Sequence, residues 1–316
     1  MRVAPNIRRM KGGGTGVLKA SLICAVLMLS LLASAAPARA LVDATSSGGA
    51  SDTPATLVGA GDIASCASSA DSKTAAIVKS IAGTVFTAGD NVYPDGSRAN
   101  YRNCYKPSWG QFKSRTQPVP GNHDYYKHPG AKAYFAYFGS RAGPSGLGYY
   151  AYDAGAWRIY ALNSELAPSS AAYGAQYTWL QDDLAANPHQ CTLAIWHRPA
   201  FSTGPHGNSA RMTPFFQLLY DNGAEMIING HDHMYERYAP IDLIGTADPT
   251  NGIREFVVGT GGASLYRYKT TDPNVEVRNN TTHGVLRLDL SATGYTWQFL
   301  PAAGGSFTDS GSGTCH

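Results

Sequence analysis

Apolar and polar positions along the chain form short blocks that predict strands and helices in alternation. Strand-like apolar blocks, each bounded by glycine or polar residues, cover 56–61, 84–89, 191–197 and 224–230. Helical spacing of the apolar positions covers 72–82, 175–186 and 211–223. This alternation of strands and helices is typical of an α/β fold.

The remaining blocks are mostly strands. A short strand is predicted after Arg115, two adjacent strands at 148–155 and 156–164, and three more at 254–262, 283–290 and 294–300. For 93–115 we expect a long loop that shapes the rim of a pocket and holds Tyr101, Cys104 and Trp109. The sequence shows neither an internal repeat nor a second linker, which indicates one domain over residues 55–316.

The first 40 residues have the pattern of a targeting segment rather than of a fold. They hold six basic and no acidic side chains, an apolar stretch at 22–36, and "ARA" at 38–40. These features predict a cleaved secretory signal peptide over 1–40, followed by a flexible, small and polar linker over 41–54. The pair Arg8-Arg9 also occurs in twin-arginine signals, so the export route stays open.

Charge and composition change once this segment is set aside. The whole chain has 25 basic and 22 acidic side chains, and removing the six N-terminal ones leaves 19 against 22, a net charge of −3. A nucleic-acid or anionic-membrane partner is therefore not expected, and after signal removal no membrane segment remains. With 43% hydrophobic residues the chain has enough apolar material for a sizeable core.

Four cysteines remain beyond the signal segment, and an even number in an exported chain predicts disulfides. Three pairings are possible. We favour Cys66–Cys104, because both lie in loops near the predicted site, and Cys191–Cys315, because it would tie the C-terminal tail to a core strand. None of the four forms a C-x-x-C pair, which excludes a zinc finger and a thioredoxin-like redox site.

Five predicted strands end in side chains that bind metal ions. These residues are Asp62, then Asp90 and Tyr93, then Asn122, His123 and Asp124, then His197, and finally His231 and His233. Ligands of open α/β sheets bind at the carboxyl ends of the strands, so these side chains are expected to meet. Apart from His123 and Asp124, the set offers two carboxylates, an amide, a phenol and three imidazoles, which exceed the needs of one tetrahedral ion and suit two ions that share a bridge.

The order "GD…GDxxY…GNHD…H…GHxH" resembles the metallo-dependent phosphatase superfamily, also called calcineurin-like phosphoesterases. The tyrosine three residues after Asp90 and the motif "GHDHMYER" at 230–237 are similar to its purple acid phosphatase branch. The resemblance implies a four-layer α-β-β-α sandwich with two mixed β-sheets and a dinuclear metal site at the C-terminal ends of the strands. The chain departs from the branch at Ala64, where Gly is common, and at Asp124, where Glu is frequent.

The resemblance also assigns the ligands. Asp62, Tyr93 and His233 would hold the first ion, Asp90 would bridge, and the second ion would bind the remaining three, Asn122, His197 and His231. The phenolate of Tyr93 favours Fe(III) at the first position, and the second would take Fe(II), Zn or Mn.

Three further residues receive roles from the same resemblance. His123 would contact the phosphate or protonate the leaving oxygen, and Asp124 would orient His123. His206 lies in a loop where the branch often has a substrate-facing histidine, and a solvated loop histidine is the alternative.

The function expected from these residues is a secreted, purple acid phosphatase-like enzyme that hydrolyses a small phosphate monoester with a metal-bound hydroxide. Two alternatives remain open. One is a phosphodiesterase or nucleotidase on the same scaffold, and the other is a non-catalytic exported protein that binds metal or phosphate. A structural zinc site at the histidine pair would leave Asp62, Asp90, Tyr93 and Asn122 unexplained. A serine hydrolase is unsupported, because no Gly-x-Ser-x-Gly motif is present.

Overall fold

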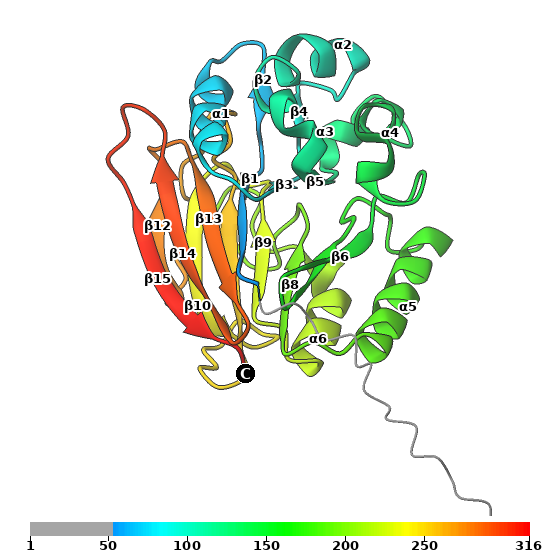
Figure 1. The fold of residues 1–316 in the computed structure, drawn as a ribbon, viewed down its shortest axis with the longest axis vertical. Coiled ribbons are helices and arrows are strands. Elements are labelled where there is room, and N and C mark those ends of the chain that lie inside the picture. The colour runs from blue at the N-terminus through cyan, green and yellow to red at the C-terminus, as the bar shows by residue number, and fades with distance from the viewer. Residues whose placement is uncertain (1–52) are drawn as a thin grey trace, which may run out of the picture. The chain divides into compact units, whose positions relative to one another are not determined.

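The computed structural model of this chain describes residues 53–316, in which two large mixed sheets lie face to face (Figure 1). The predicted signal peptide and most of the linker lie outside the described residues. The first sheet has the order β15-β14-β13-β1-β3-β5. Its strands are β1 (Ala55–Ala60), β3 (Thr84–Ala88), β5 (Thr116–Val119), β13 (Gly284–Ser291), β14 (Gly294–Pro301) and β15 (Asp309–Thr314).

The second sheet has the order β12-β10-β11-β9-β8-β7-β6. Its strands are β6 (Tyr150–Ala154), β7 (Trp157–Ala161), β8 (Cys191–Ile195), β9 (Met226–Asn229), β10 (Tyr235–Ile241), β11 (Ile253–Val258) and β12 (Val275–Asn279). In the first sheet β1, β3 and β5 run parallel, and in the second β7, β8, β9 and β11 do. Two short strands, β2 (Ala64–Ser65) and β4 (Val92–Tyr93), pair separately.

Helices cover the outer faces of the sheets. The helices are α1 (Ala70–Ser80), α2 (Arg98–Asn100), α3 (Asn122–Tyr125), α4 (Lys132–Phe138), α5 (Ala171–Ala186) and α6 (Thr213–Asp221). The α5 and α6 helices pack on the seven-stranded sheet, and α1 packs against β13 of the other sheet. The predicted sandwich with two mixed sheets is confirmed. Among residues 53–316, none of the helices is long and apolar enough to cross a membrane.

Alternation along the central strands explains the layers. In β9, Ile228 belongs to the apolar cluster that joins the two sheets, whereas its neighbour Ile227 belongs to the cluster under α5 and α6. Successive side chains of a strand point to opposite faces, so a strand buried on both sides has to be continuously apolar. This is why the apolar block at 224–230 predicts a central strand correctly.

Both predicted disulfides are present in the structure. Cys66 is bonded to Cys104 with 5.0 Å between the Cα atoms, and Cys191 is bonded to Cys315 with 5.5 Å. The first bond ties the loop after β2 to the segment after α2, and the second holds the end of the chain against β8.

The predicted loop at 93–115 is wrong in its local structure. Residues 93–115 contain the last residue of β4, the α2 helix, a π-helical segment at Tyr101–Tyr105 and a 3-10 helix at Trp109–Arg115. Tyr101 and Trp109 are 1% and 0% exposed, so they belong to the core and not to a pocket rim. Their large apolar rings favour burial, and Trp109 gains a partner there because its indole N–H donates to Thr74.

Candidate metal centre

The carboxyl ends of β1, β3, β5, β8 and β9 bring the predicted ligands together. Hydrogen bonds cross from one sheet to the other at these strand ends: the Gly61 N–H after β1 donates to the carbonyl of Val258 in β11, and the His231 N–H after β9 donates to Oδ2 of Asp62. The two sheets therefore meet at this edge, with Asp62, Asp90, His197, His231 and His233 all buried.

The first group of donors surrounds the hydroxyl of Tyr93. Its oxygen lies 2.7 Å from Oδ1 of Asp62, 2.9 Å from Nε2 of His233 and 3.0 Å from Oδ2 of Asp90. The Nε2 atom of His233 is in turn 3.2 Å from Oδ1 of Asp62. Four side chains from three strand ends thus converge on one point.

The second group shares Asp90 with the first. Nε2 of His197 lies 3.3 Å from Oδ2 of Asp90 and 3.1 Å from Oδ1 of Asn122. The His231 ring is next to the His197 ring, with 4.9 Å between their centroids. Asp62, Asp90 and His197 offer ligand atoms that all lie within 4.8 Å of one another. Asp90 therefore occupies the position between the two groups that a bridging ligand requires.

Backbone conformation at the strand ends directs these side chains. Asp62, Asp90 and His231 have positive φ angles of 58°, 47° and 73°, a conformation that is uncommon outside glycine. Such strained residues concentrate at functional sites, where the surrounding structure holds them in place. Packing explains why residue 121 is glycine, because a Cβ atom there would lie 2.2 Å from Oδ1 of Asp90.

Hydrogen bonds from the far side of the rings orient two of the imidazoles. Nδ1 of His197 faces the carbonyl oxygen of Ala88 at 2.9 Å, and Nδ1 of His233 faces that of Ser264 at 2.8 Å. A carbonyl oxygen only accepts, so each Nδ1 carries the proton and each Nε2 presents its lone pair to the centre. This arrangement is typical of metal-binding histidines.

The buried groups of the centre shift one another's pKa values. Burial, followed by the carboxylates of Asp62 and Asp90, holds the pKa of Tyr93 well above its ordinary range. Burial alone would lower the pKa of His197, but the Asp90 carboxylate raises it to about 10. His197 in turn lowers the pKa of Asp90, against the effect of burial. A donor set rich in buried oxygen and imidazole ligands fits hard to borderline divalent and trivalent cations.

His123 lies at the edge of this centre. Its ring packs against Tyr93 with 4.4 Å between centroids, and its Nε2 is 3.9 Å from Oδ2 of Asp90. Its Nδ1 lies 2.6 Å from the carbonyl oxygen of Pro94, which fixes the ring. With a side chain that is 31% exposed, His123 reaches both the donors and solvent.

The structure places Asp124 away from the role expected for it. The Nδ1 partner of His123 is Pro94, whereas the carboxylate of Asp124 accepts hydrogen bonds from the Tyr101 hydroxyl and from the backbone N–H groups of Gly121 and Asn91. As the third residue of α3, Asp124 faces back toward the N-terminus of the helix, which favours this capping interaction. Burial, followed by Asp90, raises its pKa to about 6.

His206 comes close to the centre from a separate loop. Its ring centroid is 4.1 Å from that of His231, and its Nδ1 is 2.9 Å from Oδ1 of Asp232. The residue between the two histidines of the "GHDH" motif therefore holds His206, a contact that the sequence analysis missed. The available signal was the motif itself, which places an acidic residue between the two histidines.

Two more residues at the centre were missed. The guanidinium of Arg198 lies 3.1 Å from Nε2 of His231 and is held by Glu165. Tyr266 stacks on the His233 ring, with 3.9 Å between centroids and 11° between planes. Arg198 directly follows His197, which was the only available signal, whereas nothing local indicates Tyr266.

A cleft of about 340 Å³ opens beside the first group of donors. Its lining residues are uncharged side chains and histidines: Ser65, Ala67, Ser68, Tyr93, Pro94, His123, His233, Ala263, Ser264 and Tyr266. A volume near the lower end of the range for ligand sites suits a small molecule.

An α/β sandwich whose strand ends gather carboxylate, phenol, amide and imidazole donors is the arrangement of a metal-dependent phosphoesterase. Residues 55–235 match the family model of calcineurin-like phosphoesterases. The chain therefore belongs to this family, whose members depend on two metal ions, and it is purple acid phosphatase-like.

The similarity to individual proteins is partial. The chain is 32% identical to purple acid phosphatase 15 of Arabidopsis thaliana over 154 residues, which cover 42% of this chain and 29% of that protein. It is 24% identical to purple acid phosphatase 18 of the same plant over 225 residues, or 63% of this chain and 50% of that protein. The chain thus spans half or less of the length of these relatives.

Among solved structures, the purple acid phosphatase PPD1 from seeds of yellow lupin (Lupinus luteus) superposes with a TM-score of 0.62. The match covers 84% of this chain and 54% of that one at 17% sequence identity. At this identity the likeness establishes the fold alone.

Proposed function

We propose that this protein is an exported phosphomonoesterase of the purple acid phosphatase type. The observation that carries the proposal is the Tyr93 hydroxyl, which lies within 3.0 Å of Asp62, Asp90 and His233. A neutral phenol has one proton and can donate it to only one of the two carboxylates, and both carboxylates disfavour its ionisation. A trivalent cation at this point would reverse that balance.

The donors divide between two ions in the proposed centre. Asp62, Tyr93 and His233 hold an Fe(III) ion, Asp90 bridges, and the second group holds Fe(II), Zn or Mn. The members of the second group are Asn122, His197 and His231. When bound, such ions neutralise charge on a phosphoryl group and lower the pKa of a water molecule. Export is supported by the two disulfides, which are typical of oxidising compartments.

The remaining side chains position the ester and supply the proton. The phosphate lies between the centre and the cleft, where the Arg198 guanidinium adds a positive charge next to His231. His123 keeps its Nδ1 on the Pro94 carbonyl, so its Nε2 is the atom that donates a proton to the departing oxygen. His206, held by Asp232, assists from the opposite side as a second donor or phosphate contact.

The cleft favours a monoester with an uncharged leaving group. Its lining holds no lysine or arginine side chain, and its volume of about 340 Å³ leaves little room for a second esterified group. A nitrophenyl phosphate should therefore be turned over faster than its bis-ester. Faster hydrolysis of the bis-ester would favour a phosphodiesterase instead.

The decisive experiment is metal analysis of the purified protein with a visible spectrum. We expect two ions per chain and a broad visible band from the Tyr93 phenolate bound to Fe(III). Asn122→Ala and His231→Ala should each lower turnover by orders of magnitude while the fold stays intact. Near wild-type activity in either variant would contradict the site, and tightly bound metal without hydrolysis of any phosphoester would indicate a binding protein.

A further inference from the structure

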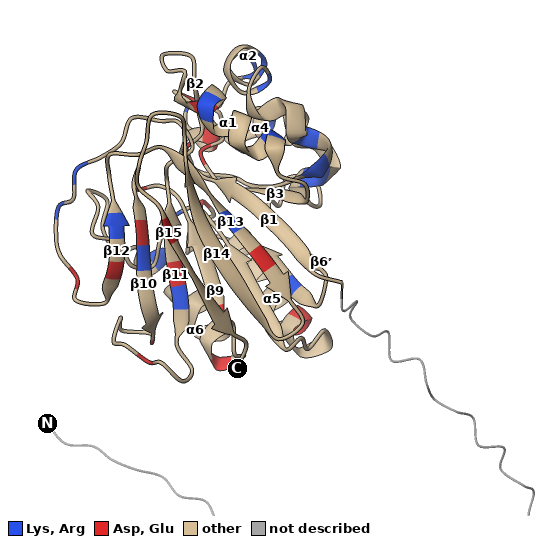
Figure 2. Ribbon diagram, turned by 60° about the vertical axis from the view of Figure 1, so that its left-hand side comes forward, with Lys and Arg blue, Asp and Glu red and all other residues tan. Residues whose placement is uncertain are grey.

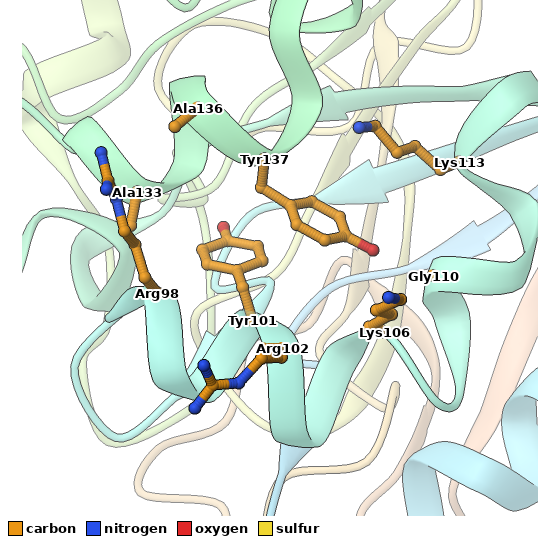
Figure 3. Close-up of a pocket in the computed structure, with 9 residues that line it drawn as sticks. All are labelled: Arg98, Tyr101, Arg102, Lys106, Gly110, Lys113, Ala133, Ala136 and Tyr137. Carbon is orange, nitrogen blue, oxygen red and sulfur yellow. The ribbon is translucent and has the colours of Figure 1, made fainter.

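A second cavity, of about 460 Å³, is formed by segments that the metal centre does not use. It is lined by α2, the two short helical segments that follow it, and α4 (Figure 3). The rings of Tyr101 and Tyr137 stack in its middle with 4.8 Å between centroids and 24° between planes. Neither the donors of the metal centre nor the lining of its cleft contributes a residue to this cavity.

Four of the residues that line this cavity are cations, and none is an acid. The four are Arg98, Arg102, Lys106 and Lys113. Figure 3 shows Arg98 and Lys113 on opposite sides of the paired rings. None of the ion pairs found within residues 53–316 involves any of the four. Like charges around one cavity repel each other, and a bound anion would remove this repulsion.

The net charge of the whole chain does not reveal this concentration of positive charge around the cavity. Residues 96–150 contain eight basic side chains and one acidic side chain, Asp124, whereas the whole chain has 25 and 22. Asp124 is fully buried and accepts a hydrogen bond from the Tyr101 hydroxyl, so it does not offset the cations around the cavity. Figure 2 shows several blue segments on the helical part of the molecule around α2 and α4, in addition to those on β10, β11 and β12.

We propose that this basic cavity binds a compact polyanion, a small molecule that carries several sulfate or phosphate groups. Guanidinium groups bind such groups through paired hydrogen bonds, and lysines add point charges. Exposed cations around a concave site focus the potential and raise the local concentration of anions. The half-buried Tyr137 ring, stacked on the buried ring of Tyr101, supplies a flat surface for the scaffold of the ligand, and Lys113 already lies 5.0 Å from the Tyr137 ring.

The test measures binding to the metal-loaded protein by calorimetry, with sucrose octasulfate as the probe because a phosphoesterase does not consume it. Saturating inorganic phosphate is present to occupy the metal centre. The test variant is Arg98→Gln/Lys113→Gln, and the matched control is Lys73→Gln/Lys79→Gln on α1, which removes the same charge from exposed positions outside the cavity. All four side chains are exposed, so the fold should tolerate both changes.

The expected result is one saturable site in the native protein, weakened about tenfold or more in the test variant and less than about twofold in the control. Inorganic sulfate alone should bind far more weakly than the octasulfate. If Arg98→Gln/Lys113→Gln fails to fold, Arg102→Gln/Lys106→Gln removes the other two cations and should give the same loss.

Several results would overturn the proposal. Equal weakening of octasulfate binding in the Lys73→Gln/Lys79→Gln control would mean that binding depends on the overall charge and not on the cavity. Displacement of the octasulfate by inorganic phosphate would place it at the metal centre. Equal affinity for single sulfate ions, or the lack of a saturable site, would show that the cavity does not recognise several charges. Phosphatase activity enters none of these measurements, so the proposed function and the polyanion site can fail separately.

Discussion

Replacement of Asp90 by Asn tests the bridge between the two donor groups. Asp90→Asn keeps the size and shape of the side chain and removes one negative charge from the point shared by both groups. Oδ1 accepts the His123 N–H at 2.7 Å, and the amide oxygen of asparagine can keep this bond. The amide nitrogen would then face the Tyr93 hydroxyl and Nε2 of His197, both of which can accept. The metal-free variant should therefore still fold, but it should be less stable than the metal-free native protein because it loses the attraction between the Asp90 carboxylate and His197.

Metal affinity should fall as well. A unit charge at about 4 Å contributes about 4 kcal/mol at an effective dielectric constant of about 20, which is about a thousandfold in affinity. Each ion that Asp90 contacts should lose this contribution. The assay is metal content and the thermal midpoint after dialysis against a chelator-buffered metal solution, because a ligand that binds only the native state raises the midpoint.

Asp124→Asn is the matched control for this experiment. Asp124 is also a buried carboxylate of the same loop region, but its partners are Tyr101, Gly121 and Asn91. The Asp124→Asn variant should be less stable, because it weakens the cap that this carboxylate forms at the start of α3, and it should keep both ions. If Asp90→Asn retained two ions with native affinity, Asp90 would not be the bridge, and the assignment of both groups would be wrong.

Three further predictions concern stability and proton transfer. Cys191→Ser/Cys315→Ser should lower the free energy of unfolding by about 5 kcal/mol, measured in urea, because the bond spans 124 residues. Burial raises the pKa of Glu255 to about 8, so the folded state holds a proton that the unfolded state releases above about pH 4.5. The contribution of Glu255 to the free energy of unfolding is therefore complete below that pH and falls by at most about 5 kcal/mol as the pH rises to 8. In Glu255→Gln, the free energy of unfolding measured against pH should fall less steeply over this range. His123→Ala should lower kcat about a hundredfold or more for an alkyl phosphate and much less for nitrophenyl phosphate, whose leaving group needs no proton; equal losses would exclude a proton donor.

Local pattern was sufficient for the strands that form the centre of each sheet. A strand buried on both faces, such as the one containing Ile227 and Ile228, is continuously apolar and stands out in the sequence. Most side chains of the two donor groups were predictable for the same reason, because they lie within a few residues of the end of such a strand. The four cysteines were predictable because few pairings exist.

The strands β10 and β15 and the helical turns between 98 and 115 were not predictable from local pattern. β15 has the sequence "DSGSGT" and exists only because β14 offers it a partner along its whole length. β10 carries the charged residues Glu236 and Arg237 in buried positions, which a search for apolar runs rejects. Arg237 is paired with Asp309, 72 residues further along the chain, and such a contact leaves no local signal.

The "GHDHMYER" motif is better understood as one structural unit than as a histidine pair. Residues 231–234 form bends before β10 begins at Tyr235, and the side chains of the motif nevertheless reach two different sides. His231 and His233 reach the metal centre. Asp232 and Glu236 reach the other side, where Asp232 holds His206 and Glu236 accepts the backbone N–H of Thr203. The even positions therefore fix the loop at 202–206 against the same strand end from which the odd positions supply ligands. This explains why two imidazoles stand two residues apart, and it makes the placement of His206 a consequence of the motif rather than of its own loop.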